Sequence, residues 1–201
     1  MSDPIAYIVD DDDSIRELLS WLMRRNGIRA AAFATAAEFL EARRDEAPAC
    51  LILDLHMPGM GGLELQRHLA ERGIALPIVF LSGRADVPKA VHAVKSGAVD
   101  FIEKPFDYKR IVEVVRECLA RDAAARVGRE RARRAAERLA TLSQREREVL
   151  DRVVSGKPNR VIAEELDISI KTVEAHRARI MEKLEAGSLA ELVQLAMPGG
   201  G

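Results

Sequence analysis

Apolar runs and amphipathic stretches alternate along the first 120 residues. Short β-rich runs stop at polar, Gly or Pro positions, and stretches with apolar residues three and four apart follow them. The runs predicted as strands are 5–9, 28–33, 50–53, 77–81 and 99–102. The stretches predicted as helices are 15–26, 35–45, 62–72, 86–97 and 108–120. Strict alternation with short connections predicts an α/β fold, a five-stranded doubly wound parallel sheet covered on both faces.

Three polar residues stand where helix N-caps are preferred: Ser14, Thr35 and Asp86. Ser14 and Thr35 each have a glutamate three residues later, as in a capping box.

The pattern changes after residue 120. Residues 121–140 contain no Pro and are rich in Ala, Arg and Glu, which favours an exposed helix that continues the preceding one, with Gly128 as a candidate break. Residues 121–138 carry seven Arg and three acidic residues, a net charge of +4. This charge fits either contact with DNA phosphate or a solvated spacer.

Four helices are predicted beyond the linker, over 143–155, 159–166, 170–185 and 188–196, so this part of the chain is all-α. Ser143 with Glu146 forms a capping-box pattern at the first of them. A tight turn at 167–169 joins the second and third. Two helices joined in this way predict a helix-turn-helix whose longer second helix reads DNA, although a small helical packing domain would show the same elements.

Length and composition agree with two domains. The predicted division is 1–120, a helical linker 121–138, and 139–201. No signal peptide and no transmembrane helix are predicted. Cys50 and Cys118 lie far apart, which fits a reducing cytoplasm and buried packing better than a disulfide or a metal site. The net charge is −1, so charge alone does not indicate nucleic acid.

Polar side chains stand at the ends of four predicted strands. Open parallel sheets bind ligands beyond the carboxyl ends of their strands. Asp54 alone is equally well explained as the cap of the next helix. Taken together, the strand-end residues favour one shared crevice; they are Asp10, Asp11, Asp54, Ser82 and Lys104.

The chemistry expected of that crevice is phosphoryl transfer. Clustered carboxylates raise one another's pKa unless a cation lies among them, and Mg²⁺ prefers oxygen ligands. A metal, a hydroxyl and an ammonium can neutralise the oxygens of a phosphoryl group in transfer. One carboxylate is then available as a nucleophile that forms an acyl phosphate.

Residues 5–120 resemble the receiver domain of two-component response regulators, which has a flavodoxin-like fold. The resemblance rests on Val9-Asp10-Asp11, Leu53-Asp54, Met57-Pro58, Gly61-Gly62, Ser82-Gly83 and the motif at 101–106. It implies that Asp54 accepts phosphate from a sensor histidine kinase. It also implies that Mg²⁺ is held by Asp10, Asp11, Asp54 and the backbone carbonyl of His56.

The same resemblance assigns further roles. Ser82 and Lys104 match the phosphate-sensing hydroxyl and ammonium, and Phe101 matches the aromatic side chain that moves with that hydroxyl. The peptide bond before Pro105 is expected to be cis. His56 and Arg84, each two residues past a site residue, are hypothesised to set the lifetime of the phosphoryl group.

Residues 139–197 resemble the LuxR-type DNA-binding domain, through the segments 142–150, 156–166 and 169–176. A receiver followed by this domain is the architecture of the NarL/FixJ class of transcription factors. It implies a cytoplasmic regulator that binds double-stranded DNA, forms a homodimer when phosphorylated and has RNA polymerase as a candidate partner, with no membrane contact. The predicted dimer face lies near helix 86–97 and strand 99–102.

DNA contacts follow from the predicted inward position of Val173. The residues then expected at the floor of the groove are Glu174, Ala175 and Ala178. Phosphate contacts are expected from Lys171, Thr172, Arg177 and Arg179, and from Asn159 or Arg160 on the preceding helix.

Two alternatives remain open. One is a metal-dependent phosphotransferase with an aspartate nucleophile, although no Gly-rich phosphate-binding P-loop is present. The other is a constitutive DNA-binding protein whose receiver serves only in dimerisation.

Overall fold

The computed structural model describes residues 3–44, 47–83 and 87–196. The chain divides into two compact units, residues 1–126 and 127–201, and each is described by itself. Asp86 and Arg84, a predicted N-cap and a predicted modulator of the phosphoryl group, lie outside the described residues.

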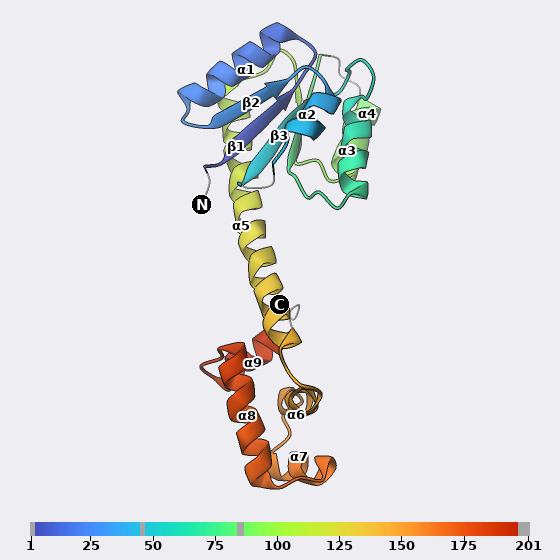
Figure 1. Cartoon of the computed structure of the whole chain (residues 1–201). Helices are drawn as coiled ribbons and strands as arrows, with labels where there is room; N and C mark the ends of the chain where they lie inside the picture. The colour runs from blue at the N-terminus through green and yellow to red at the C-terminus, as the bar shows by residue number, and fades with distance from the viewer. Residues whose placement is uncertain (1–2, 45–46, 84–86, 197–201) are drawn as a thin grey trace. The chain divides into compact units, whose positions relative to one another are not determined.

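The first unit is built on one parallel sheet in the strand order β2-β1-β3-β4-β5 (Figure 1). All four neighbouring pairs are parallel. The strands are β1 (Ile5–Val9), β2 (Arg29–Phe33), β3 (Ala49–Asp54), β4 (Ile78–Ser82) and β5 (Asp100–Glu103). The predicted doubly wound α/β fold is confirmed.

Helices cover both faces of the sheet, α1 and α5 on one side and α2, α3 and α4 on the other (Figure 1). They are α1 (Asp13–Arg25), α2 (Ala36–Ala42), α3 (Gly62–Glu71), α4 (Val87–Lys95) and α5 (Tyr108–Ala140). Successive strand residues alternate between the two layers: Ile52 packs with the α1 and α5 side and Leu53 with the opposite side. Every residue of β3 is buried, which is why the central strand is a continuous apolar run up to Asp54.

The start of α1 differs from the prediction. Asp12, and not Ser14, is the N-cap: its side chain accepts a hydrogen bond from the amide of Ser14 at 2.8 Å. A carboxylate caps well and also favours the positive end of the helix dipole. Thr35 is confirmed as the cap of α2. The remaining boundaries shift by a few residues, as is common where helices and strands fray.

Helix α5 runs without a break through Gly128, so the proposed interruption there is wrong. Ion pairs along its exposed surface stabilise the helix locally. Glu130 pairs with Arg133 and with Arg134, and Arg133 also pairs with Glu137. These internal partners favour the solvated-spacer interpretation of the linker over phosphate binding.

The second unit is a cluster of helices around one core. After the end of α5 come α6 (Gln144–Val154), α7 (Asn159–Leu166), α8 (Ile170–Leu184) and α9 (Leu189–Ala196) (Figure 1). The predicted capping box is present, with Ser143 as N-cap and Glu146 as its partner. The helices bury Val149, Ile162, Val173, Ile180 and Leu184 together. This arrangement confirms the predicted all-α helix-turn-helix domain.

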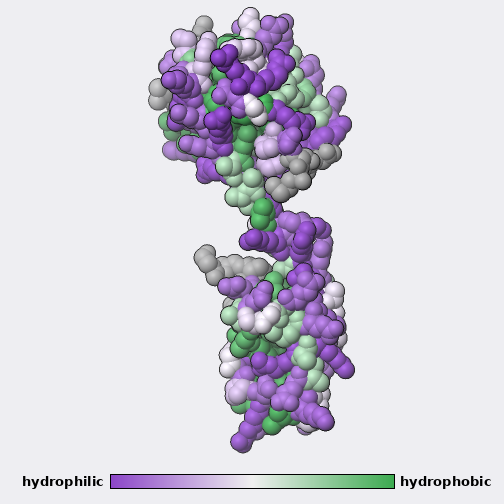
Figure 2. Space-filling model, turned by 90° about the vertical axis from the view of Figure 1, so that its left-hand side faces the viewer, coloured by the Kyte–Doolittle hydropathy of each residue, from purple (hydrophilic) through white to green (hydrophobic). Residues whose placement is uncertain are grey.

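Hydrophilic residues cover most of the visible surface of each unit (Figure 2). Within the described part of the chain, no helix combines the length and the apolar character needed to cross a membrane.

Candidate functional site

Asp54 ends β3 and lies buried at the carboxyl edge of the sheet, with 6% of its surface exposed. Its carboxylate accepts hydrogen bonds from the amide of His56 at 2.7 Å and from Nζ of Lys104 at 2.7 Å. It does not cap α3, whose N-cap is Gly61. Asp54 is therefore held as part of a polar cluster at the sheet edge.

Helix α3 begins directly against this residue. A Cβ atom on Gly62 would lie 2.4 Å from the carbonyl oxygen of Asp54 and 3.0 Å from the ring of Phe80. Since real Cβ atoms do not approach a backbone oxygen so closely, only glycine lets the helix start here. Gly62 is thus a packing requirement of the site.

Lys104 joins two buried carboxylates. Its Nζ donates to Asp10 at 2.6 Å and to Asp54 at 2.7 Å. Asp10 is almost fully buried, and burial raises its pKa, although the bonds from Lys104 and from the amide of Asp12 oppose that shift. Burial alone would lower the pKa of Lys104, but the two carboxylates outweigh it, and the pKa of Lys104 is raised.

Ser82 lies on β4, the strand that pairs with the one carrying Asp54, and Phe101 lies on β5, the next strand along the sheet. Ser82 is fully buried at the end of β4, and its carbonyl oxygen accepts the amide hydrogen bond of Lys104 at 2.7 Å. The peptide bond between Lys104 and Pro105 is cis, as expected. Phe101 is half-buried and packs against the apolar layer under α2, α3 and α4. The structure thus brings the hydroxyl-bearing residue and the ammonium-bearing residue to the same sheet edge as Asp54.

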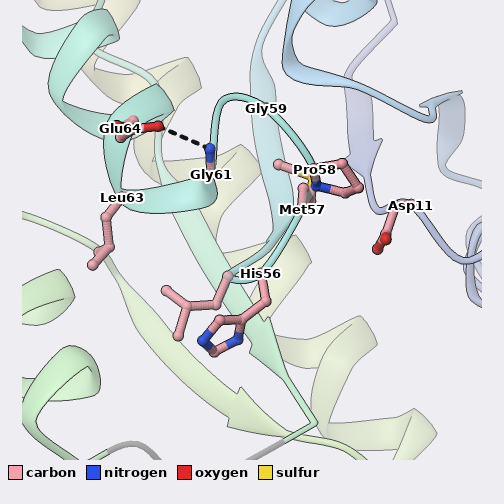
Figure 3. A pocket seen from close by; sticks show the side chains of 9 residues that line it. Asp11, His56, Met57, Pro58, Gly59, Gly61, Leu63 and Glu64 are labelled. Atoms are coloured by element: carbon pink, nitrogen blue, oxygen red, sulfur yellow. Dashed lines mark hydrogen bonds between the residues drawn. The ribbon is translucent and has the colours of Figure 1, made fainter.

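Asp11 stands apart from the other site residues. It is exposed, and its carboxylate makes no hydrogen bond or ion pair with any residue that the structure describes. It borders an open hollow of about 510 Å³ whose other wall is the β3–α3 loop, with His56, Met57 and Pro58 (Figure 3). The hollow thus lies between Asp11 and the loop that directly follows Asp54.

The donor chemistry of this edge fits a hard cation. Asp10, Asp11 and Asp54 offer carboxylate oxygens, and His56 offers a backbone carbonyl, which are ligand types that Mg²⁺ prefers. The described residues do not contain a preassembled group of three or more His, Cys, Asp or Glu side chains that could hold a metal. Asp10 and Asp54 are instead drawn together by Lys104, while Asp11 faces the hollow.

Residues predicted to contact DNA lie mostly on the outer surface of α8. The exposed ones on α8 are Lys171, Thr172, Glu174, Ala175, Ala178 and Arg179. Thr172 also takes part in the helix cap, since its amide donates to Ser169 Oγ at 3.0 Å.

The remaining predicted contacts are tied to other residues. Arg177 is half-buried and donates to Asn159 Oδ1 at 2.9 Å, which links α8 to α7. Arg160 pairs with Glu164 at 3.0 Å.

Two domain models match the chain. Residues 6–116 match the response regulator receiver domain, and residues 140–196 match the bacterial regulatory proteins of the luxR family. The chain belongs to the NarL/FixJ class of response regulators. This response regulator is a DNA-binding transcriptional regulator with a receiver domain, and not a classical enzyme.

Similar proteins cover nearly its whole length. It is 44% identical to the transcriptional regulatory protein FixJ of Rhizobium meliloti over 200 residues, which are 100% of this chain and 98% of that one. It is 42% identical to the response regulator protein TodT of Pseudomonas putida, over 95% of this chain and 84% of that one. The solved structure of the response regulator StyR is 40% identical, with a TM-score of 0.89 over 97% of this chain and 98% of that one.

One residue of the site was missed from the sequence. The guanidinium of Arg16 on α1 donates to the carbonyl oxygen of Asp10 at 2.7 Å. A basic residue in the first turns of an amphipathic helix ordinarily marks a solvated face, so periodicity gave no reason to single it out.

Proposed function

We propose that Asp54 accepts a phosphoryl group from a sensor histidine kinase and that this modification controls DNA binding. The observation that carries the proposal is the position of Lys104, whose ammonium meets both Asp10 and Asp54 at the carboxyl edge of the sheet. This is the place where open α/β sheets bind their ligands.

In the proposed step, a carboxylate oxygen of Asp54 attacks the phosphorus of a phosphohistidine. A phosphorus–oxygen bond forms, the phosphorus–nitrogen bond breaks, and its electron pair stays on the imidazole nitrogen, which takes a proton from solvent. Lys104 is placed to bond the phosphoryl oxygens, and Ser82 lies on the neighbouring strand with a hydroxyl that could follow them. The chain assists its own phosphorylation and dephosphorylation in this way, without being a classical enzyme.

Mg²⁺ would be held by Asp10, Asp11, Asp54 and the carbonyl of His56. When bound, it neutralises negative charge on the transferring phosphoryl group. The chain's own contribution is to hold the carboxylates in place. Lys104 bonds both buried carboxylates, and its charge opposes the rise that burial causes in the pKa of Asp10.

In the second unit, α8 is proposed as the recognition helix. Glu174, Ala175 and Ala178 would face the base edges, and Lys171 with Arg179 would meet phosphates. Thr172, Arg177, Asn159 and Arg160 complete the proposed phosphate contacts.

The phosphorylated protein is proposed to be a cytoplasmic homodimer that acts on double-stranded DNA, with RNA polymerase as a further partner. Helix α4 supports a dimer surface near β5, since Val91 and Val94 are 46% and 50% exposed on it. The functional division is proposed as receiver 1–120, linker 121–138 and DNA-binding domain 139–201.

Phosphorylation at Asp54 is tested by treating the full chain with acetyl phosphate and Mg²⁺ and measuring the mass of the intact protein by mass spectrometry. Wild type is expected to gain one phosphoryl group and Asp54→Asn none. Lys104→Met is expected to react about 100-fold more slowly, because a preorganised charge is lost from the transition state. Asp151→Asn, at an exposed position of α6, is the matched control. Equal labelling of Asp54→Asn and wild type would refute the assignment.

A further inference from the structure

Four consecutive aspartates, residues 10–13, form the loop between β1 and α1 and the first residue of α1. Four adjacent carboxylates repel one another, so the loop needs specific partners to keep one shape. The side chain of Arg16 packs over the loop with 15% of its surface exposed. It makes two contacts there: Nη1 donates to the carbonyl oxygen of Asp10 at 2.7 Å, and Nη2 forms an ion pair with Asp13.

Three of the four carboxylates are occupied within the unit. Asp10 binds Lys104 and accepts the amide of Asp12 at 3.0 Å. Asp12 caps α1 through the amide of Ser14 at 2.8 Å. Asp13 pairs with Arg16. Asp11 is left without a hydrogen bond or ion pair to any described residue and borders the hollow beside His56.

We infer that Arg16 is a positioning residue, which fixes the loop so that Asp10 stays buried against Lys104 while Asp11 is presented to a bound divalent cation. The inference rests on the proposed phosphoacceptor site. Arg16 acts through the backbone of Asp10 and the carboxylate of Asp13, and it does not touch the reacting atoms.

The physical reason is the planar fork of the guanidinium. Two of its nitrogens can bond a carbonyl and a carboxylate at once, which an ammonium cannot reproduce with the same geometry. Without it, the carbonyl of Asp10 loses its charged donor and Asp13 loses its counter-ion. The loop would then spread to relieve repulsion, and Asp11 would sample positions away from the cation.

The test measures Mg²⁺ affinity by calorimetry on the full-length protein for Arg16→Met, Arg16→Lys and wild type. Loss of a residue that orients metal ligands typically weakens metal binding about 10- to 100-fold. Arg16→Met is expected to fall in that range, and Arg16→Lys between it and wild type. Arg24→Met, an exposed substitution on the same helix, is the control and should bind as wild type does.

A second readout needs no metal. In the metal-free protein, Arg16→Met should speed hydrogen exchange at the amides of Asp12 and Ser14, which bond within the loop. The amide of Glu38, which bonds the cap of α2, should be unchanged. If Arg16→Met lowered the melting temperature yet kept Mg²⁺ affinity within about twofold of wild type, the role would be purely structural and the inference wrong.

Failure of the proposed function would look different. If the wild-type protein bound no Mg²⁺, or if Asp54→Asn were phosphorylated as wild type is, the phosphoacceptor assignment would fall whatever Arg16 does. If wild type is phosphorylated normally and Arg16→Met binds Mg²⁺ as tightly as wild type does, only the positioning role of Arg16 is overturned.

Discussion

At the scale of single residues, Lys104 explains how two buried carboxylates coexist. Burial raises the pKa of Asp10 and by itself would lower the pKa of Lys104. The opposite charges of Lys104 and the carboxylates offset the cost of burial on both sides. For Lys104 the attraction of Asp10 and Asp54 outweighs burial, so its pKa is raised. Replacing Lys104 by a neutral residue would leave two carboxylates facing each other without their shared cation.

His56 is the residue-scale determinant that we expect to control phosphoryl lifetime. It is exposed, lies two residues past Asp54 and lines the hollow beside the β3–α3 loop. His56→Ala should speed loss of the phosphoryl group about threefold, which is less than 1.4 kcal/mol in the barrier. The measurement is the decay of phosphorylated protein after the donor is removed.

His68→Ala is the matched control for this prediction, since His68 lies in α3 and does not line the hollow. If phosphorylated His56→Ala decayed at the wild-type rate, the side chain of His56 would have no role in the lifetime of the phosphoryl group.

The grouping of Asp10, Asp54 and Lys104 was predictable because the polarity of a parallel sheet places the carboxyl ends of its strands together. The turn of Asp11 toward the hollow, while Lys104 bonds the other two carboxylates, was not predictable, since side-chain directions in a loop are not set by periodicity. Arg16 escaped notice for a related reason: its bond to Asp10 goes to a backbone carbonyl, which has no sequence pattern.

At the scale of elements, the cap of α6 joins two helices of the DNA-binding unit. Glu146 is buried, accepts the amide of Ser143 at 2.8 Å and pairs with Lys183 of α8 at 2.7 Å. The bond from Lys183, followed by that from Ser143, lowers the pKa of Glu146 to about 2. The capping box therefore also anchors the far end of α8, the proposed recognition helix.

This depressed pKa predicts an acid-sensitive contribution to stability. Because the carboxylate ionises more readily when folded, its contribution is complete above the ordinary pKa of 4.5 and is lost as the pH falls toward about 2. Glu146→Gln should cost about 1 kcal/mol at neutral pH, the size of a lost cap. The difference in the free energy of unfolding between Glu146→Gln and wild type should shrink at about pH 2.5, when unfolding is followed through amide signals of the second unit.

Glu182→Gln, at an exposed position of α8, serves as the control and should show little change at either pH. A difference for Glu146→Gln that stayed constant from about pH 6 to about pH 2.5 would contradict the linkage.

The proposed role of α8 as the recognition helix predicts how two substitutions change DNA binding. Lys171 and Glu174 are both exposed on α8, three residues apart. Lys171→Ala should weaken all DNA sequences about equally and reduce the salt slope by about one, as expected for a phosphate contact. Glu174→Ala should change base preference by about 1–3 kcal/mol at one position, as expected for a base contact.

Binding of both variants to duplexes selected from a random-sequence pool, at several salt concentrations, separates the two roles. If Lys171→Ala changed base preference and Glu174→Ala weakened binding to all sequences equally, Lys171 would be the base contact and Glu174 would not.

The elements themselves were largely predictable, because alternating apolar runs and caps such as Thr35 and Ser143 are local signals. Their ends were less so. Asp12, and not Ser14, is the N-cap of α1. Both are good capping residues, and the path of the loop decides which of them caps the helix. Gly128 failed to break α5 because one glycine costs a helix only about 1 kcal/mol.

At the scale of the whole molecule, α5 contributes to the interior of both units. In the first, Asp122 is buried and accepts the amide of Ala49, at the start of the strand that ends in Asp54, at 2.9 Å. In the second, Ala135 is buried and Leu139 packs against the core of the DNA-binding helices. A single helix thus shares packing with the acceptor strand and with the DNA-binding core.

The central claim is that phosphorylation of Asp54 switches DNA binding. Its most direct test is the affinity of the full chain for a selected duplex, with sedimentation run in parallel, before and after treatment with acetyl phosphate and Mg²⁺. We predict that wild type gains about 5- to 150-fold in affinity, the usual range of coupling between two sites, and becomes dimeric, while Asp54→Asn changes in neither respect. Equal affinity and equal mass for both proteins under both conditions would show that the receiver does not switch the DNA-binding domain.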